Sequence, residues 1–389
     1  MDAEDPFMIV YTSGTTGKPK GAVHVHGGFL VKIAQEVRQQ VDMHADDVLC
    51  WVTDMGWIMG PWEVVGGLAQ GGTIVLFEGA PDYPAPDRLW RLVDEHRITI
   101  LGISPTLVRA LMRYGDEPVA KHDLSSLRVL ASTGEPWNPA PWTWYFEKIG
   151  KGTRPVINFS GGTEVGACFL TALTIMPLKS CSLGGPSLGM ATDVFDTEGK
   201  PLRGGVGELV CTKPWPAMTR GFWNDPGGRR YLATYWSRWP DVWVHGDWAS
   251  VDADGHWYLH GRSDDTLKIS GKRVGPAEIE SAVIGHPAVV ESAAIGVPHE
   301  VKGEAVWCFV VLRPGIAPSD ALAREVRDQV IAALGKSFAP EQVRFVADLP
   351  RTRSAKILRR AIRARLLNQD PGDLSSLENP SALEEIPRA

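Results

Sequence analysis

Residues 11–21 read Tyr-Thr-Ser-Gly-Thr-Thr-Gly-Lys-Pro-Lys-Gly, the most informative stretch of the chain. Glycines tolerate positive φ and let a backbone approach an anion closely, while hydroxyl side chains and backbone N–H groups can donate hydrogen bonds to that anion. Lys18 and Lys20 add positive charge. The stretch therefore predicts a loop that binds the phosphates of a nucleotide.

The loop differs from the P-loop of nucleoside triphosphatases, which has four residues between its glycines and then Gly-Lys-Ser/Thr. Here two residues separate Gly14 from Gly17, and Pro19 follows Lys18. The apolar run Phe7–Tyr11 before the loop predicts a buried strand, and α/β sheets bind ligands at strand ends. A flexible linker is the alternative interpretation, which this preceding strand disfavours.

Length and composition limit the classes of protein to which the chain can belong. Its 389 residues, 44% of them hydrophobic, are enough for two or three domains. The net charge of −6 does not indicate a nucleic-acid partner or an anionic membrane surface, so small molecules are the expected partners. Five scattered cysteines without a Cys-x-x-Cys pair, and no apolar run of about 20 residues, predict a cytoplasmic protein without a membrane span.

The pattern of hydrophobic residues predicts an α/β fold. Between residues 22 and 180, β-rich runs such as Val48–Val52 and Ile98–Ile103 alternate with amphipathic stretches such as Pro86–His96, which favours a largely parallel sheet with helical crossovers. Residues 181–261 read as short strands of a small β-rich subdomain. After residue 261 the pattern predicts a separate small α+β domain. Residues 369–389, rich in Pro, Ser, Asp and Glu, predict a disordered tail.

Two acidic residues follow predicted strands and could contact a nucleotide. Glu164 closes the stretch Asn158-Phe159-Ser160-Gly161-Gly162-Thr163-Glu164 and offers a hard oxygen ligand for Mg²⁺. A solvated loop acid is the alternative. Asp247 in His245-Gly246-Asp247 could accept hydrogen bonds from ribose hydroxyls, or could simply be a turn aspartate.

Two further motifs flank the predicted small domain. Residues 261–273 read Gly-Arg-Ser-Asp-Asp-Thr-Leu-Lys-Ile-Ser-Gly-Lys-Arg, and residues 350–356 read Pro-Arg-Thr-Arg-Ser-Ala-Lys. A basic run alone is usually a solvated face. Together with the phosphate loop, Glu164 and Asp247, however, these motifs make the chain resemble the adenylate-forming enzymes, specifically the acyl-CoA synthetases and their acetyl-CoA synthetase-like branch. The resemblance extends over residues 3–365.

The resemblance implies an ATP-dependent, AMP-forming acid–thiol ligase. In that family, a carboxylic acid and ATP give an acyl-adenylate and pyrophosphate, and the CoA thiol then displaces AMP. ATP, Mg²⁺ and CoA are therefore expected. The implied organisation is an adenylation core at 1–261, a hinge at 262–265, a mobile C-terminal domain at 266–368 and the tail at 369–389.

The resemblance also implies roles for individual residues. The triphosphate would contact Thr12, Ser13, Gly14, Thr15, Thr16, Gly17, Lys18 and Lys20. The adenine would lie against Gly134, Glu135, Pro136 and Asn158, while Thr163 would contact the α-phosphate and Glu164 would bind Mg²⁺. Asp247 and Arg262 would hold the ribose, and Arg273 a nucleotide phosphate. Lys356 would be catalytic, approaching the carboxylate and α-phosphate, Asp264 would be the hinge, and Ser270 and Gly271 would face CoA.

The chain departs from the family pattern in two consequential places. Family members have a long region before the phosphate loop, so we expect a missing N-terminal portion or a complementing chain. Gly161 stands where acetate enzymes carry a tryptophan that closes the acyl pocket. Because glycine leaves that volume open, we expect an acid larger than acetate, in a pocket formed by Ile58, Met59, Thr133 and Gly161.

Two alternatives to an acyl-CoA ligase remain open from the sequence. One is an adenylating domain that loads a carrier-protein thiol, although the spacing of Trp51, Trp57 and Pro61 fits CoA ligases better. The other is an inactive, truncated nucleotide-binding fragment. The absence of an expected front part favours the fragment, whereas the presence of Glu164 and Lys356 disfavours it.

Overall fold

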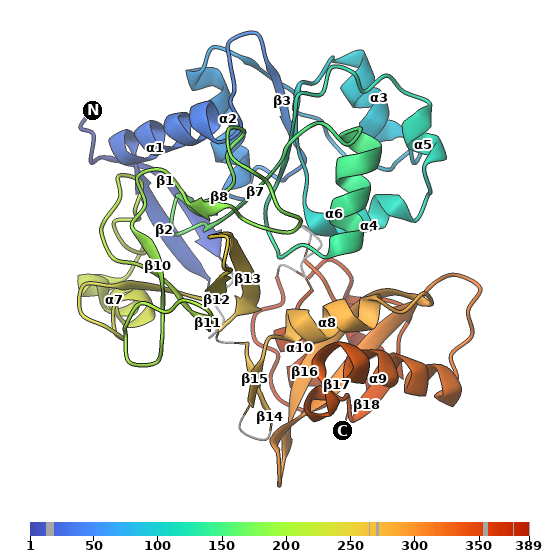
Figure 1. Cartoon of the computed structure of the whole chain (residues 1–389). Helices are drawn as coiled ribbons and strands as arrows, with labels where there is room; N and C mark the ends of the chain where they lie inside the picture. Colours follow the sequence, from blue (N-terminus) through green and yellow to red (C-terminus); the bar gives the residue numbers. More distant parts are fainter. Residues whose placement is uncertain (13–18, 264, 270–271, 353–356, 376, 389) are drawn as a thin grey trace. The chain divides into compact units, whose positions relative to one another are not determined.

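The computed structural model describes residues 1–12, 19–263, 265–269, 272–352, 357–375 and 377–388 (Figure 1). The chain forms two compact units. Unit 1 comprises Met1–Thr12 and Pro19–Leu259, and unit 2 contains His260–Ala389. Among the described residues, no helix has the length and apolar character needed to cross a membrane.

The core of unit 1 is a seven-stranded sheet with the order β4-β3-β5-β6-β7-β8-β9. Neighbouring strands from β4 to β7 run parallel, and β8 and β9 continue the sheet antiparallel. The strands are β3 (Val48–Trp51), β4 (Thr73–Ile74), β5 (Ile100–Gly102), β6 (Val129–Ser132), β7 (Val156–Gly162), β8 (Ala167–Thr171) and β9 (Gly185–Pro186). The helices are α1 (His26–Gln39), α2 (Met59–Ala69), α3 (Arg88–Glu95), α4 (Pro105–Met112), α5 (Glu117–Ala120), α6 (Pro139–Trp144) and the π-helical turn η1 (Tyr145–Ile149).

Helices cover both faces of this sheet. Successive residues of a strand point to opposite faces, so Ile100 packs with Phe29 and Trp62 of α1 and α2, while Leu101 packs with Trp90 and Val108 of α3 and α4. Burial on both faces explains why these strands read as continuous apolar runs. The expected α/β fold with helical crossovers is confirmed.

The strand before the phosphate loop lies in a different setting from the one expected. β1 (Pro6–Thr12) pairs antiparallel with β2 (Lys20–Val25) in a two-stranded sheet. Tyr11 is 58% exposed, so the prediction of a buried strand was wrong for this face of β1. A two-stranded ribbon leaves one face in solvent, but the uniformly apolar run Phe7–Tyr11 does not indicate which of its residues are exposed. The register pairs Thr12, the last described residue before position 13, with Lys20.

A second sheet of unit 1 has the order β10-β11-β12-β13, with antiparallel pairing of β10, β11 and β12. Its elements are β10 (Thr192–Phe195), β11 (Val206–Cys211), β12 (Trp243–Val251) and β13 (Trp257–Arg262), with η2 (Pro226–Gly228) and α7 (Arg229–Tyr235). Its core is aromatic: Trp243 stacks on Tyr235 with ring centroids 4.0 Å apart, and meets Trp215 edge-on. This packing anchors α7 against β12.

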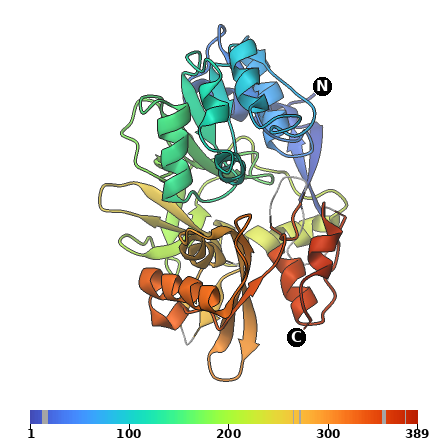
Figure 2. The ribbon, with the colours of Figure 1, turned by 90° about the vertical axis from the view of Figure 1, so that its right-hand side faces the viewer.

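Unit 2 is built on a sheet with the order β15-β14-β17-β16, with β18 parallel to β17. Its strands are β14 (Leu267–Ile269), β15 (Lys272–Val274), β16 (Val289–His299), β17 (Gly303–Leu312) and β18 (Gln342–Phe345). Its helices are α8 (Pro276–Ile284), α9 (Asp320–Leu334), η3 (Lys336–Phe338), α10 (Arg359–Leu366) and α11 (Pro380–Glu384). One apolar cluster joins α8 and α9 to the sheet, and a second joins α10 and α11 to it. Figure 2 shows the ribbon of unit 2, in orange to red, from a second direction.

The last residues differ from the expected disordered tail at 369–389. Leu383 and Ile386 are buried with Leu349 and Leu358 in the second cluster of unit 2. Sequence composition missed this segment because it contributes only a few apolar side chains. Those side chains complete a core that the rest of the unit already forms.

Candidate active site

The carboxylate of Glu164 is the centre of a polar cluster of unit 1. Glu164 follows β7 and is 7% exposed. Its Oε1 accepts hydrogen bonds from the hydroxyl of Tyr235 at 2.6 Å and from Oγ1 of Thr12 at 3.2 Å. Nζ of Lys20 lies 3.5 Å from the same oxygen. The cluster therefore joins β1, β2, β7 and α7 at one carboxylate oxygen.

Lys20 is held in place by aromatic groups as well as by charge. Its Nζ donates to the hydroxyl of Tyr235 at 3.2 Å, and lies 5.5 Å from the ring centroid of Phe222 and 5.2 Å from that of Tyr235. Such contacts stabilise a cation that is partly removed from water. The ammonium group is therefore fixed at the end of the phosphate-loop motif.

Glu164 is ionised although it is buried. Burial raises the pKa of Glu164, but the charges of Lys20 and His245 and the hydrogen bond from Tyr235 outweigh burial and lower this pKa below its ordinary value. A buried carboxylate that stays charged at neutral pH can bind a cation.

The backbone beside Glu164 is fixed by His24 of β2. Nε2 of His24 lies 2.8 Å from the carbonyl oxygen of Thr163, and the ring is 1% exposed. Burial lowers the pKa of His24, despite hydrogen bonds that raise it, so the ring is neutral at pH 7. A neutral ring that donates from Nε2 to this carbonyl orients the peptide between Thr163 and Glu164.

The same turn approaches the motif that contains Asp247. A Cβ atom at Gly162 would lie 2.7 Å from Cε1 of His245, so glycine allows the histidine ring to sit against the end of β7. Nε2 of His245 lies 3.7 Å from Oδ2 of Asp247, and its ring meets Phe169 edge-on. The structure therefore brings the Glu164 turn and the Asp247 strand together.

The residues expected at the adenine lie just after β6 and within the neighbouring parallel strand β7. Ser132, the last residue of β6, pairs with Asn158 of β7, and Gly134, Glu135 and Pro136 follow β6 directly. Glu135 accepts a hydrogen bond from Nη2 of Arg109 at 2.9 Å. Gly134, Glu135 and Pro136 thus lie beyond the carboxyl end of β6, and Asn158 lies where the pairing of β6 with β7 ends, the edge at which parallel sheets bind ligands.

The four residues expected in the acyl pocket come from the start of α2, from the residue after β6 and from β7. Ile58 and Met59, at the start of α2, pack against the cluster that contains Phe159. The hydroxyl of Thr133 donates to the carbonyl of Phe159 at 2.6 Å. A Cβ atom at Gly161, however, would lie 2.0 Å from the carbonyl oxygen of Ala167. The space next to Gly161 is thus filled by β8 rather than left open, which corrects the reason given for the glycine.

Several expected site residues cannot be placed in these clusters. Ser13, Gly14, Thr15, Thr16, Gly17, Lys18, Asp264, Ser270, Gly271 and Lys356 lie outside the described residues. Arg262 ends β13 and belongs to unit 2, and the backbone of Arg273 lies in β15. Their expected roles remain predictions.

Two residues of the cluster were missed by the sequence interpretation. Tyr235 stands in an ordinary helical stretch, and His24 in a strand-like one, so neither had a motif that could single it out. Both act on residues that the motifs did identify, Glu164 and Thr163.

The donor set fits Mg²⁺ only if phosphates supply further ligands. Among the described residues, no group of three or more His, Cys, Asp or Glu side chains is arranged to hold a metal. Mg²⁺ usually binds one or two carboxylates together with substrate phosphates and water. Glu164 supplies such a carboxylate, and its contacts with Thr12, Lys20 and Tyr235 all involve one oxygen, Oε1.

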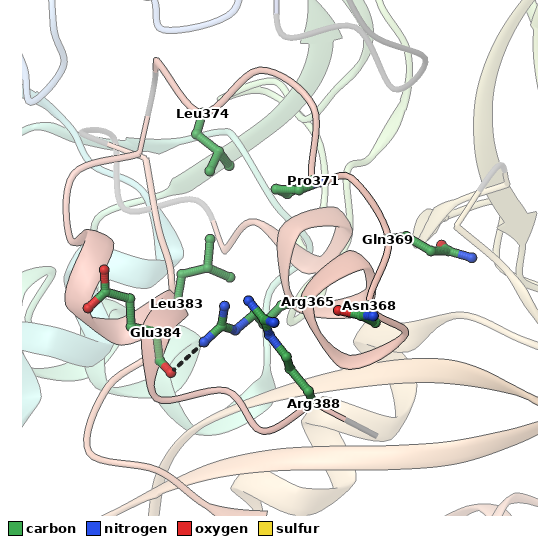
Figure 3. Close-up of a pocket in the computed structure, with 8 residues that line it drawn as sticks. All are labelled: Arg365, Asn368, Gln369, Pro371, Leu374, Leu383, Glu384 and Arg388. Carbon is green, nitrogen blue, oxygen red and sulfur yellow. Dashed lines mark hydrogen bonds between the residues drawn. The ribbon is translucent and has the colours of Figure 1, made fainter.

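A cavity of about 210 Å³ lies elsewhere, within unit 2, between α10, α11 and the segment that joins them (Figure 3). Arg365, Asn368, Gln369, Pro371, Leu374, Leu383, Glu384 and Arg388 line it. None of these residues belongs to the motifs above, and the cavity forms no part of the candidate site.

The family assignment agrees with the geometry. The AMP-binding enzyme family matches residues 1–223, and the AMP-binding enzyme C-terminal domain matches residues 278–356. The chain therefore belongs to the family of AMP-binding enzymes.

Within this family, the chain is similar to proteins that are named as CoA synthetases or CoA ligases. The chain is 44% identical to the acetyl-coenzyme A synthetases of Pyrobaculum aerophilum and Gemmatimonas aurantiaca, over 100% and 99% of its own length. It spans 58% and 60% of the length of those proteins. Among solved structures, the acetoacetyl-CoA synthetase of Streptomyces lividans matches with a TM-score of 0.88 and 34% identity, over 99% of this chain and 59% of that one. An anthranilate CoA ligase in complex with anthranoyl-AMP matches with a TM-score of 0.80 and 29% identity, over 91% and 66% of the respective chains.

Proposed function

We propose that the chain carries the adenylate-forming site of an AMP-forming acyl-CoA synthetase. A carboxylate attacks the α-phosphate of ATP, forming an acyl-adenylate and releasing pyrophosphate, and the thiol of CoA then displaces AMP. The observation that carries the proposal is the buried, ionised Glu164 held by Thr12, Lys20 and Tyr235. Acyl-CoA ligase relatives of similar fold support it.

In this proposal, the chain's contribution to the first half-reaction is electrostatic. Attack of one anion on another needs positive charge where negative charge accumulates. Lys20 supplies a fixed ammonium group at the end of the phosphate loop, and Lys356 would supply a second beside the reacting carboxylate. Mg²⁺, when bound through Glu164, neutralises phosphate charge. Thr163 is oriented through its own carbonyl by His24.

We assign the remaining roles by the same family pattern. Gly134, Glu135, Pro136 and Asn158 would contact the adenine, and Asp247 with Arg262 the ribose. Rotation about Asp264 would withdraw Lys356 and bring Ser270 and Gly271 to the thioester-forming site. Arg273 would contact a nucleotide phosphate. The corresponding domain division is 1–261, 262–265 and 266–368.

We also propose that the acid is larger than acetate. The support is the residue type alone: Gly161 stands where acetate enzymes carry a tryptophan, so no indole closes the pocket from this position. The volume beside Gly161 does not contribute to this support, because β8 fills it. Met59 and Ile58, at the start of α2, would then set the size limit.

The test is acid-dependent release of pyrophosphate from ATP by the 389-residue chain, measured over carboxylic acids of increasing length. Trapping of the product with CoA and, separately, with a holo-carrier protein identifies the acceptor. We expect pyrophosphate release with acids longer than acetate and a CoA thioester. Transfer to the carrier protein alone would favour the carrier-loading alternative, and no release with any acid would contradict the proposed function.

A further inference from the structure

We propose that Asn379 is a positioning residue for Lys356: through it, the C-terminal segment, residues 377–386, fixes residues 348–352, which precede residues 353–356 in the chain. The proposal rests on the proposed function, in which Lys356 acts in adenylate formation. It concerns described residues that flank Lys356 in sequence.

The amide of Asn379 forms hydrogen bonds with three groups before the lysine. Its Oδ1 accepts from the backbone N–H of Arg351 at 2.9 Å. Its Nδ2 donates to Oδ2 of Asp348 at 2.7 Å and to the carbonyl oxygen of Leu349 at 3.0 Å. Asparagine suits this position because one side chain must both accept and donate. Aspartate would lose both donated bonds and bring a second carboxylate towards Asp348.

Backbone pairing extends the contact to both flanks of residues 353–356. Thr352 forms a β-bridge with Leu377, and the N–H of Glu378 donates to the carbonyl of Arg351 at 2.9 Å. Arg351 in turn bridges Ile357, the residue after Lys356. Thr352 is only 2% exposed. We call residues 348–352 and 357–358, which precede and follow residues 353–356 in the chain, the stem. The C-terminal segment is thus paired with the stem.

The C-terminal segment is itself firmly attached to unit 2. Arg365 of α10 donates from Nη2 to the carbonyl of Glu384 at 3.2 Å (Figure 3) and from Nε to that of Ile386 at 3.4 Å. Arg360 donates to the carbonyls of Asp373, at 2.9 Å, and Pro371. Because the segment is anchored independently of Asn379, it can serve as a fixed support for the stem.

The stem also has contacts that do not involve the C-terminal segment. Nη2 of Arg351 lies 3.0 Å from Oε2 of Glu291 on β16, and the N–H of Leu358 donates to the carbonyl of Pro350 at 2.8 Å. Arg359 donates to both carboxylate oxygens of Glu280 on α8. Loss of the Asn379 amide should therefore loosen the stem while unit 2 stays folded.

Measuring the two half-reactions separately distinguishes an effect on the position of Lys356 from a general loss of stability. In the proposed mechanism, Lys356 acts in adenylation and is withdrawn during thioester formation. A residue that positions Lys356 should therefore affect only the first step. The test compares Asn379→Ala with Ser381→Ala, a substitution in α11 at a side chain that forms no hydrogen bond to the stem in the described residues.

The experiment measures acid-dependent ATP–pyrophosphate exchange, CoA thioester formation from a supplied acyl-adenylate, and amide hydrogen exchange of residues 349–358. For Asn379→Ala we expect adenylation to fall by about tenfold or more, in line with loss of partly buried hydrogen bonds. We expect faster hydrogen exchange in residues 349–358 and thioester formation within about twofold of wild type. Ser381→Ala should leave all three unchanged.

Wild-type adenylation in Asn379→Ala would overturn the inference, as would an equal loss of both half-reactions, which would indicate a structural role only. Lys356→Ala distinguishes a failure of the role proposed for Asn379 from a failure of the proposed function. If Lys356→Ala abolishes adenylation and Asn379→Ala does not reduce it, the inference alone fails. If Lys356→Ala leaves adenylation intact, or if the wild-type chain forms no adenylate, the proposed role of Lys356 or the proposed function fails, and the inference fails with it.

Discussion

The hydroxyl group of Tyr235 donates a 2.6 Å hydrogen bond to Oε1 of Glu164, the residue proposed to bind Mg²⁺ with the nucleotide. Tyr235 is itself held by stacking on Trp243, with ring planes 9° apart. The aromatic core of the β10–β13 sheet therefore sets the orientation of the carboxylate. Tyr235 is a positioning residue in this account.

Tyr235→Phe should weaken the Mg²⁺-dependent part of ATP binding. The phenylalanine ring can keep the stack on Trp243, but Glu164 loses a charge-assisted hydrogen bond of about 1.5–3 kcal/mol. We expect calorimetric titrations to require about ten times more Mg²⁺ for half-maximal tightening of ATP binding.

Tyr231→Phe is the matched control for this substitution. It removes a buried tyrosine hydroxyl from the same helix, one that donates to the carbonyl of Thr219 instead of to Glu164. An equal Mg²⁺ dependence in Tyr235→Phe and wild type would contradict the role assigned to Tyr235.

Lys20→Met should weaken ATP binding while largely preserving the fold. The substitution keeps an apolar side chain against Phe222 but removes the charge 3.5 Å from Glu164 and beside the phosphate loop. We expect the dissociation constant for ATP to rise by about 10–100-fold, as for a lost charged hydrogen bond. Lys179→Met, which removes an exposed ammonium paired with Asp252, should leave the constant unchanged. Similar constants for the two variants would argue against a phosphate contact by Lys20.

Gly161→Ala should destabilise unit 1. Its Cβ would meet the carbonyl oxygen of Ala167 at 2.0 Å, so β7 and β8 would have to separate. Overpacking of this kind costs about 1–3 kcal/mol, measurable as a lower midpoint of denaturant unfolding. Gly185→Ala is the control, because its nearest neighbour, Cδ1 of Trp257, is 4.0 Å away. Equal midpoints would mean that β7 and β8 are not packed so closely.

Glu63→Gln should alter the pH dependence of stability. Glu63 is fully buried, its Oε1 accepts from the N–H of Trp51, and Oε2 has no partner within the described residues. Burial raises the pKa of Glu63 to about 8, against the opposing effect of the Trp51 hydrogen bond. The titratable thiol of Cys50 lies close enough to be affected by its charge.

The direction in which stability changes with pH follows from the proton bound to Glu63. The folded protein keeps this proton up to about pH 8, whereas the unfolded chain loses it near the ordinary pKa of 4.5. Wild-type stability should therefore decline between these values by about 1.4 kcal/mol per pH unit from this group. Glutamine cannot lose a proton, so the stability difference between the variant and wild type should shift in favour of the variant as pH rises. A constant difference from pH 5 to 8 would refute the raised pKa.

Sequence patterns predicted the parallel sheet because buried strands and amphipathic helices leave strong periodic signals. They missed the exposed face of β1, since the apolar run Phe7–Tyr11 reads alike in a buried strand and in a half-exposed ribbon. They also missed the folded C-terminal segment. Leu383 and Ile386 become informative only once Leu349 and Leu358 are seen beside them.

The candidate site was predictable where its residues belong to contiguous motifs, as Thr12, Lys20 and Glu164 do. Tyr235, His24 and Asn379 each contact residues that are far away in the sequence, through one side chain. A local sequence pattern cannot indicate such a contact. Gly161 shows a different limit. Its role depends on the carbonyl of Ala167, so a missing side chain did not mean an empty volume.

The most direct test of the central claim is acid-dependent ATP–pyrophosphate exchange by the 389-residue chain, compared with its Glu164→Gln variant across a Mg²⁺ titration. The account predicts exchange in the wild type, and in the variant a fall of about 100-fold or more that added Mg²⁺ only partly restores. Equal exchange in both proteins would contradict the role of Glu164. No exchange in the wild type with any acid would contradict the assignment of an adenylate-forming site.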